Sequence, residues 1–490
     1  MTKFLNHSIP FLLGLLVIAA CVRPTPVAVY VTPTPQTTDV AAAVPTAAET
    51  ATDSVLASPT LTETATPGVV EPTVTFIGPV VGPDYTQPPT STPQPTATPP
   101  ATNTPIDTLT PFPTTTPLPT ETPGGPTPTP LPGLRSSLMG VQVFSELEQP
   151  DWDNTMHRAT QLKVGWVKVQ VIWDLVQPTN SGECSIECQR LELYLQDIDN
   201  RGFNLLISVA KAPDWARDSI EEDGPPRDPQ MLADFLTFFL GRNDLWQRID
   251  AIEVWNEPNL AREWRGRSLS GAEYMRYFDA AYRAIRSFSP NITIITAAPA
   301  PTGTSSVSVD DRAFLRQMYA SGLSQYTDVA IGVHPYSWGN PPDARCCNGV
   351  DNQSWDDDPH FFFADTLDDY REIMVSSSHS TIQMWATEFG WATWAGFPGE
   401  PPEAWMLYNT PETQANHTLR AFEYAQQLDY MGPMILWNLN LAQVHPELIA
   451  ERDERVAYSL VLPEGNPQER PLYWMLFDSP RSDITPTPGS

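Results

Sequence analysis

Residues 249–258 read IDAIEVWNEP, a short apolar run that predicts a buried β-strand and ends in a carboxylate motif. Residues 382–390 read IQMWATEFG and repeat this plan, with Glu388 in the place that Glu257 holds in the first stretch. A glutamate after an apolar run is common and often caps the next helix. The two motifs therefore have to be weighed against the organisation of the whole chain.

Eight apolar, β-rich runs alternate with amphipathic stretches between residues 135 and 478. The runs lie at 138–144, 164–173, 203–210, 249–255, 292–297, 328–334, 382–388 and 432–438. Between them apolar residues recur at helical spacing, as in Leu232, Phe235, Leu236 and Phe239. A strand and a helix repeated eight times predict an α/β fold, the (β/α)8 or TIM barrel. A doubly wound open sheet is the competing architecture, but no glycine-rich phosphate loop follows any of the runs.

The region from 135 to 478 is longer than the roughly 250 residues typical of such a barrel, so we expect insertions in its loops. Four long segments each follow a predicted strand, at 177–190, 215–229, 337–359 and 393–412. Segments in this position lie on the carboxyl face of the barrel, where such folds carry out their chemistry.

The first 21 residues resemble a bacterial lipoprotein signal peptide. Lys3 precedes an apolar run from 9 to 20, and small residues lead to Cys21, which such a signal would lipidate as the mature N-terminus. The run is shorter than the roughly 20 apolar residues of a transmembrane helix. An ordinary signal peptide with an incidental cysteine is the alternative. The lipoprotein interpretation predicts an extracytoplasmic, cell-surface protein held to the membrane by an N-terminal lipid anchor.

Residues 22–134 form a segment rich in proline and threonine, which contains about half of the 53 prolines of the 490-residue chain. Such a composition cannot bury enough apolar surface to offset the entropy of ordering, so we expect a disordered, extended stalk. The folded domain is predicted at 135–478, and residues 479–490 are predicted to form a short disordered tail.

The net charge of −30, from 58 acidic and 28 basic residues, argues against a nucleic-acid partner, because neutralising phosphates needs clustered Lys and Arg. Four cysteines remain besides Cys21, at 184, 188, 346 and 347. Pairing within each couple and pairing across the two couples are both open. The cysteines could instead bind zinc, but no histidine or further cysteine lies at ligand spacing beside either couple, so we expect no metal.

If the strand count is right, Glu257 and Glu388 close the fourth and seventh strands and face each other across the barrel mouth. Two facing carboxylates are what retaining glycoside hydrolysis needs, with the carboxyl groups roughly 5–5.5 Å apart. One protonates the leaving oxygen while the other attacks the anomeric carbon. Glu257 must then be protonated near neutral pH, which partial burial and the anion of Glu388 would favour. Two helix-capping glutamates are the simpler alternative.

The two motifs resemble the signatures of clan A glycoside hydrolases. Asn256-Glu257-Pro258 follows the fourth strand and Thr387-Glu388-Phe389-Gly390 ends the seventh, and the longer string from Trp255 to Leu260 is similar to family 39, with family 5 as the other candidate. The resemblance covers essentially the whole folded domain. It implies that Glu257 is the general acid/base, that Glu388 is the nucleophile, and that Asn256 hydrogen-bonds the sugar 2-hydroxyl, with no cofactor.

The resemblance also suggests supporting residues. A His-x-Tyr motif at the sixth strand positions the nucleophile in this clan, which implies that Tyr336 donates to Glu388; His334 either belongs to the site or is a satisfied structural group. Trp437, at the end of the eighth strand, matches a tryptophan that forms a sugar platform, since the axial C–H face of a pyranose is apolar.

Three further tryptophans, Trp173, Trp215 and Trp264, follow the second, third and fourth strands and are either walls of sugar subsites or ordinary packing. Related enzymes often have an arginine on the second strand that supports the nucleophile, and this chain has none there. Either Lys168 or Gln170 replaces it, or the nucleophile is held differently.

The sequence therefore predicts a retaining glycoside hydrolase that cleaves β-O-glycosidic bonds of an extracellular polysaccharide or oligosaccharide by double displacement. Transglycosylation would use the same residues. The alternative is a catalytically silent surface lipoprotein that binds glycans, because a barrel fold alone does not imply catalysis.

Overall fold

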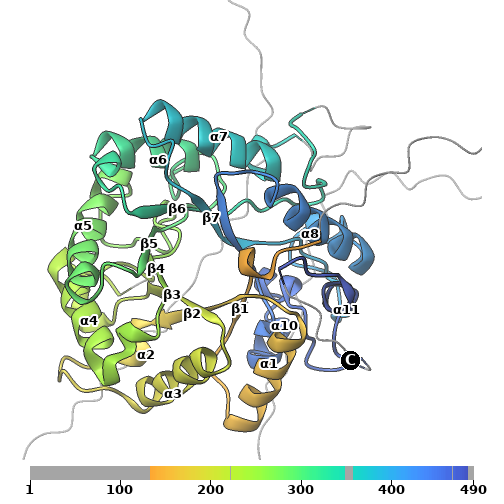
Figure 1. Cartoon of the computed structure of the whole chain (residues 1–490), viewed down its shortest axis with the longest axis horizontal. Coiled ribbons are helices and arrows are strands. Elements are labelled where there is room, and N and C mark those ends of the chain that lie inside the picture. Colours follow the sequence, from red (N-terminus) through yellow and green to blue (C-terminus); the bar gives the residue numbers. More distant parts are fainter. Residues whose placement is uncertain (1–132, 221, 348–356, 466, 484–490) are drawn as a thin grey trace, which may run out of the picture. The chain divides into compact units, whose positions relative to one another are not determined.

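The computed structural model of the protein describes residues 133–220, 222–347, 357–465 and 467–483. Within them eight parallel strands pair in sequence order and close into a barrel (Figure 1). They are β1 (Met139–Val143), β2 (Trp166–Ile172), β3 (Asn204–Ala210), β4 (Ala251–Val254), β5 (Thr293–Thr296), β6 (Val329–Val333), β7 (Met384–Phe389) and β8 (Met431–Leu436). The predicted barrel is confirmed, and the closed ring excludes an open sheet. Cys21 and the stalk up to residue 132 lie outside the described residues.

Helices follow the strands and form a ring outside the barrel (Figure 1). The α-helices are α1 (Gln149–Gln161), α2 (Trp173–Val176), α3 (Ile186–Asn200), α4 (Pro229–Gly241), α5 (Gly271–Phe288), α6 (Asp311–Ala320), α7 (Phe363–Ser376), α8 (Pro411–Ala425), α9 (Leu441–Val444), α10 (Glu447–Ala450) and α11 (Pro471–Asp478). Short 3-10 helices lie at Ser136–Leu138, Asp214–Ala216, Arg242–Gln247, Leu323–Gln325, Pro359–Phe361, Ala404–Leu407 and Glu454–Tyr458. Among the described residues, none of these helices is long and apolar enough to cross a membrane.

Local sequence explains where the main helices begin. Asp228, Ser270, Asp310 and Thr410 each precede α4, α5, α6 or α8 and accept a hydrogen bond from a backbone N–H in the first turn. Such caps satisfy amide groups that the helix itself leaves without a partner. The helices are thus fixed at the ends that follow the long loops of the barrel.

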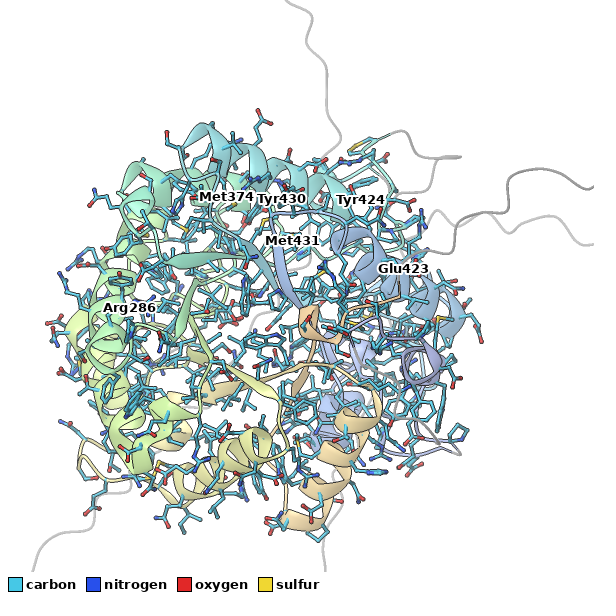
Figure 2. All side chains as sticks on the ribbon, in the orientation of Figure 1. Arg286, Met374, Glu423, Tyr424, Tyr430 and Met431 are labelled. Carbon is cyan, nitrogen blue, oxygen red and sulfur yellow. A yellow bond between two sulfur atoms is a disulfide. The ribbon has the colours of Figure 1, made fainter. Side chains whose placement is uncertain are left out.

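Figure 2 shows side chains filling the space between the strands and helices of the domain. Inside the barrel they are arranged in layers. One layer is wholly apolar and consists of Trp166, Leu206, Ala251, Ile295, Ala330, Trp385 and Ile435. Because side chains alternate along a strand, the residues two positions further on also point inward, one layer nearer the carboxyl ends. Three of these are Lys168, Glu253 and Thr387, all 0% exposed. The interior of the barrel is therefore apolar in this layer and polar in the next layer, nearer the carboxyl ends of the strands.

The folded domain extends beyond its predicted C-terminal boundary. Leu134 forms a parallel bridge with Arg481, and the carboxylate of Asp483 accepts hydrogen bonds from the backbone N–H groups of Ser136 and Ser137. The prediction of a tail from Ser479 placed the boundary too early, because these residues pair with the start of the domain.

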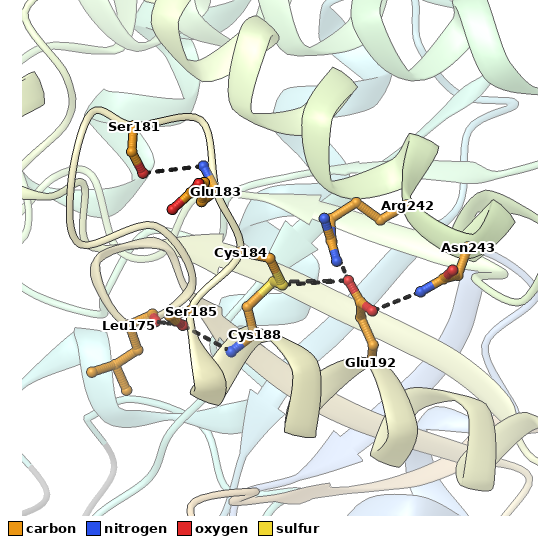
Figure 3. The surroundings of a disulfide bond; sticks show 9 residues. All are labelled: Leu175, Ser181, Glu183, Cys184, Ser185, Cys188, Glu192, Arg242 and Asn243. Carbon is orange, nitrogen blue, oxygen red and sulfur yellow. Dashed lines mark hydrogen bonds and ion pairs between the residues drawn. A yellow bond between two sulfur atoms is a disulfide. The ribbon is translucent and has the colours of Figure 1, made fainter.

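Both cysteine couples pair internally, as Cys184–Cys188 and Cys346–Cys347. The first disulfide ties the loop after β2 to the start of α3 (Figure 3). Beside it Glu192 accepts hydrogen bonds from Arg242 and from Asn243, the latter at 2.8 Å. Pairing within each couple, left open by the sequence, is thus the observed connectivity.

Close approach of β5 and β6 requires a glycine at position 332. A Cβ atom at Gly332 would lie 2.3 Å from the carbonyl oxygen of Thr296. We therefore expect Gly332→Ala to lower the free energy of unfolding by about 3 kcal/mol, because the backbone of both strands has to shift. Gly303→Ala is the control, since its Cβ would meet only His360 at an ordinary 3.6 Å. Urea denaturation measures both variants, and equal stabilities would contradict this account of the strand contact.

Candidate active site

The ends of β4 and β7 bring the two predicted carboxylates together. Glu388 lies within β7, and Glu257 follows β4 by three residues in a turn where Trp255 and Glu257 have φ angles of 80° and 41°. Side chains rarely adopt such left-handed conformations, which are concentrated at functional sites. One oxygen of Glu257, one oxygen of Glu388 and one ring nitrogen of His334 all lie within 4.8 Å of one another.

Glu388 is held through both of its carboxylate oxygens. Tyr336 donates its hydroxyl to Oε2 at 3.0 Å, and the ammonium of Lys168 lies 3.1 Å from Oε1. With its amide nitrogen facing the site, Gln142 on β1 also donates to Oε1 at 3.2 Å. These donors fix the orientation of a carboxylate that is only 6% exposed.

Gln142 links Glu388 to Trp437, the predicted sugar platform. In the same orientation, its amide oxygen accepts a hydrogen bond from Nε1 of Trp437 at 3.2 Å. Trp437 also contacts the rings of Tyr336 and Tyr458, with centroids 6.2 and 5.3 Å away. The half-buried indole of Trp437 is therefore held in a fixed orientation beside Glu388, as a platform for a pyranose ring requires.

Glu257 is paired with groups of positive charge. Nδ1 of His334 lies 3.1 Å from its Oε1, and the guanidinium of Arg262 lies 3.6 Å from its Oε2. The side chain of Glu257 is 12% exposed and that of Arg262 is 62% exposed. Glu257 is thus the more accessible of the two carboxylates, since the side chain of Glu388 is 8% exposed.

These contacts set the protonation of the Glu257–His334 pair. Burial alone would raise the pKa of Glu257, but the hydrogen bond and charge of His334, together with Arg262, lower it. Burial would lower the pKa of His334, but the charge of Glu388 and the contact with Glu257 raise it. The proton of the pair therefore lies on His334 rather than on Glu257. This differs from the expectation that burial and the charge of Glu388 keep Glu257 protonated. Hydrogen-bonded groups of this kind titrate as a pair.

Tyr336→Phe tests the support of Glu388 directly. Burial, followed by the charge of Glu388, raises the pKa of Tyr336 well above its ordinary value, so its hydroxyl remains a donor. Losing one preorganised donor is expected to lower kcat on a reactive aryl glycoside by about 10- to 100-fold. Tyr319→Phe, which removes a buried hydroxyl bonded to His379 away from the site, should leave kcat unchanged. Equal kinetic effects in the two variants would show that the loss is merely structural.

Asn256 lies between Trp255 and Glu257 in the same turn. Its side-chain oxygen is buried and has no hydrogen-bond partner among the described residues. A buried polar atom normally has a partner, so this oxygen suits a hydroxyl donated by a bound molecule. Its contact with a sugar 2-hydroxyl stays a prediction, as do the catalytic roles of Glu257 and Glu388.

Two of the tryptophans proposed as subsite walls are packed in the core instead. Trp173 is 1% exposed and stacks on Phe235 with a centroid distance of 4.5 Å. Trp264 is also 1% exposed and lies against Trp255 and Tyr277, at 5.7 and 5.1 Å. The expectation that these two side chains contact substrate is corrected, because neither has a free face. Trp215 is partly buried, with its ring edge-on to Trp173.

The cluster of Glu257, His334 and Glu388 has the donor types that could ligate a metal ion. However, the ammonium of Lys168 already lies 3.1 Å from Glu388, and Arg262 lies 3.6 Å from Glu257. Both carboxylates are thus next to fixed cations of the chain. This arrangement suits proton transfer and nucleophilic attack better than the binding of a cation.

Sequence reasoning missed several residues at the mouth of the barrel. The sequence indicates Lys168 only as one of two candidates on its strand, and its motifs do not point to Gln142, Glu253 or Arg262. The signal for the first three was present, because each is a polar residue in the middle of an otherwise apolar strand. In a barrel such a residue points either inward or into the helix layer, and only the register of the neighbouring strands decides which.

No protein-family model matches the sequence, and no curated protein is similar to it in sequence. Similarity is found among solved structures. A family 39 glycoside hydrolase from the gut symbiont Bacteroides cellulosilyticus WH2 is 15% identical, with a TM-score of 0.51 and 70% of this chain covered. The chain spans 63% of the length of that structure.

Two further structures show weaker likeness. The GH53 catalytic domain of Ignisphaera aggregans is 15% identical, with a TM-score of 0.45, and the match covers 71% of this chain and 98% of the other. A GH10 structure from Paenibacillus barcinonensis is 14% identical, with a TM-score of 0.43, and the match covers 70% and 95%. At these identities likeness shows the fold alone. The described domain therefore has the (β/α)8 barrel that is also found in a family 39 glycoside hydrolase.

Proposed function

We propose that this protein is a retaining glycoside hydrolase that cleaves β-O-glycosidic bonds. The observation that carries the proposal is the pair of facing carboxylates, whose oxygens lie within 4.8 Å of each other across the barrel mouth. One oxygen of each carboxylate lies within this distance of an oxygen of the other, which supports the separation of roughly 5–5.5 Å used by retaining enzymes over the roughly 6.5–9.5 Å of inverting enzymes.

In the first step a carboxylate oxygen of Glu388 attacks the anomeric carbon of the sugar. Tyr336 and Lys168 hold that carboxylate at 3.0 and 3.1 Å, so its attacking oxygen is oriented before the reaction. The bond from the anomeric carbon to the leaving oxygen breaks, and its electrons go to that oxygen. The proton on Nδ1 of His334 passes to Glu257, which delivers it to the leaving oxygen, so that His334 becomes neutral and Glu257 is again a carboxylate.

In the second step Glu257, a carboxylate beside neutral His334, accepts a proton from water and returns it to Nδ1 of His334. That water attacks the anomeric carbon of the glycosyl ester, and the electrons of the ester bond return to Glu388. Two inversions restore the original configuration. A sugar hydroxyl in place of water would give transglycosylation through the same intermediate.

We further propose that the domain acts outside the cytoplasm, anchored by lipid at Cys21 and held away from the membrane by the stalk. The motif around Cys21 and the proline-rich composition of residues 22–134 support this arrangement. The substrate would then be an oligosaccharide or polysaccharide that cannot enter the cell.

A screen of the full-length protein against aryl β-glycosides and β-linked polysaccharides tests the proposed function. We expect release of the aryl group from at least one β-glycoside by the wild type, and none above background by Glu388→Gln, which keeps the size of the side chain. Silence of the wild type across both panels, together with a change in tryptophan fluorescence when glycan is added, would instead identify a glycan-binding barrel.

A further inference from the structure

Directly below the two carboxylates, a second pair of charged residues lies inside the barrel. Lys168 on β2 and Glu253 on β4 are both fully buried, with Nζ and Oε2 2.8 Å apart. Burying charges is costly even when they are paired, and the layer beneath is filled by apolar side chains. The fold does not need charges to fill this space, so the pair calls for an explanation in terms of the site.

The ammonium of Lys168 has three N–H donors, and three acceptors surround it. The ammonium donates hydrogen bonds to Oε1 of Glu388 and to the carbonyl oxygen of Thr387, both at 3.1 Å, and forms an ion pair with Oε2 of Glu253 at 2.8 Å. The lysine thus binds two carboxylates at once and also the backbone next to one of them.

Glu253 holds the same region from the other side. Its Oε1 accepts a hydrogen bond from the hydroxyl of Thr387 at 2.6 Å and from the backbone N–H of Ala298 at 3.3 Å. Because Thr387 precedes Glu388 on β7, Glu253 is tied both to the lysine and to the strand that carries the nucleophile.

We propose that Lys168 and Glu253 form a positioning pair. Lys168 holds Glu388 in place, and Glu253 balances the charge of Lys168 throughout the double displacement. The proposal rests on the assignment of Glu388 as nucleophile. Neither residue touches the substrate, and no proton moves on either of them. Lys168 orients one oxygen of Glu388, and Glu253 supplies the negative charge that Lys168 needs when Glu388 has lost its own.

The charge changes of the reaction give the reason. When an oxygen of Glu388 bonds to the anomeric carbon, the carboxylate becomes a neutral ester, and a buried lysine with no other partner would be left uncompensated. Glu253 still faces that lysine in the intermediate. Burial would lower the pKa of Lys168, but Glu253 and Glu388 raise it above its ordinary value, which is consistent with a lysine that stays charged.

Two variants of the full-length protein are expected to change the titration of Glu388 in opposite directions. Lys168→Met removes a cation that favours the charged carboxylate, so the midpoint should rise by about 1 pH unit or more. Glu253→Gln removes a like charge, so the midpoint should fall by about 1 pH unit. A purely structural role would not produce opposite signs.

The midpoint is measured by 13C NMR of glutamate-labelled protein, with the Glu388 signal assigned by its loss in Glu388→Gln. The acidic limb of the pH profile of kcat/KM gives a second, kinetic readout. The groups next to Glu388 are Gln142, Lys168, Glu257, His334 and Tyr336. Glu253 lies behind Lys168, and Trp437 lies behind Gln142 and Tyr336. Each variant removes one charged side chain of this set by substitution.

Two controls separate charge from folding. Thr387→Val removes the hydroxyl bonded to Glu253 but no charge, so we expect a lower melting temperature and no shift of the midpoint. The double variant Lys168→Met/Glu253→Gln removes the pair together and should titrate within about half a unit of wild type, because the two changes oppose each other. It also covers the case in which either single variant fails to fold.

Shifts of the same sign in both single variants, or no shift in folded protein, would overturn the positioning role. The NMR titration needs no substrate. A protein without glycosidase activity but with opposite shifts would refute the proposed function and leave the pair's control of Glu388 intact. Normal activity with unshifted midpoints would support the proposed function and refute the positioning role of the pair.

Discussion

Replacement of Glu388 by alanine is expected to lower kcat on an aryl β-glycoside by about 10⁴-fold or more, because the variant lacks the carboxylate that is proposed to form the covalent intermediate. The space left by the carboxylate is bordered by Lys168 and Tyr336, which both favour an anion. Added azide should enter this space and attack the anomeric carbon directly. The product is then an α-glycosyl azide, inverted relative to the substrate, which NMR identifies.

The matched control for this experiment is Glu372→Ala, which deletes the same side chain from an exposed position on α7. It should retain wild-type kinetics, with no azide adduct. Retention of more than about one tenth of wild-type kcat by Glu388→Ala would show that another residue is the nucleophile. An azide product of retained configuration would contradict the assignment in the same way.

Replacement of Glu257 by alanine is expected to act differently on the two steps. Glycosides with poor leaving groups need the acid and should lose about 10³-fold in kcat/KM, whereas a dinitrophenyl glycoside should lose less than about tenfold. Hydrolysis of the intermediate needs the base and becomes rate-limiting. Azide should then accelerate turnover and give a β-glycosyl azide, because it attacks the glycosyl ester that Glu388 has formed.

Glu263 offers a stringent control for the acid. Burial and the charge of Glu257 raise the pKa of Glu263 to about 7, which would suit a general acid, and its carboxylate lies 4.0 Å from Arg262. We nevertheless expect Glu263→Gln to change kcat/KM by less than about tenfold on all leaving groups, because Glu257 and not Glu263 pairs with His334. If kcat/KM depended on the leaving group in Glu263→Gln but not in Glu257→Ala, Glu263 and not Glu257 would be the general acid.

The barrel could be predicted because its strands are buried on both faces and therefore stand out as apolar runs. Two of these runs lead directly to Glu257 and Glu388. The spacing of apolar residues and the two carboxylate motifs therefore both indicated the carboxyl edge of one sheet. Tyr336 and Trp437 could be predicted as supporting residues because they lie at the ends of the sixth and eighth strands. The structure brings Glu257 and Glu388 within 4.8 Å of each other, and Tyr336 contacts both Glu388 and Trp437.

The network beneath the site could not be predicted, because it depends on the register of strands that are distant in sequence. Lys168, Glu253 and Thr387 come from β2, β4 and β7, and nothing in a single strand states that their side chains meet. The protonation of Glu257 was missed for the same reason, since it depends on the contact with His334. Trp173 and Trp264 were placed near the site because a tryptophan after a strand can either pack or face outward, and sequence alone does not separate the two.

The most direct test of the central claim is the configuration of the first sugar released from a β-glycoside, followed by proton NMR before mutarotation. A carboxylate spacing within 4.8 Å predicts that the β-anomer forms first and that the α-anomer appears later by mutarotation. An α-anomer formed first would mean that water attacks the substrate directly, and would contradict the covalent role of Glu388.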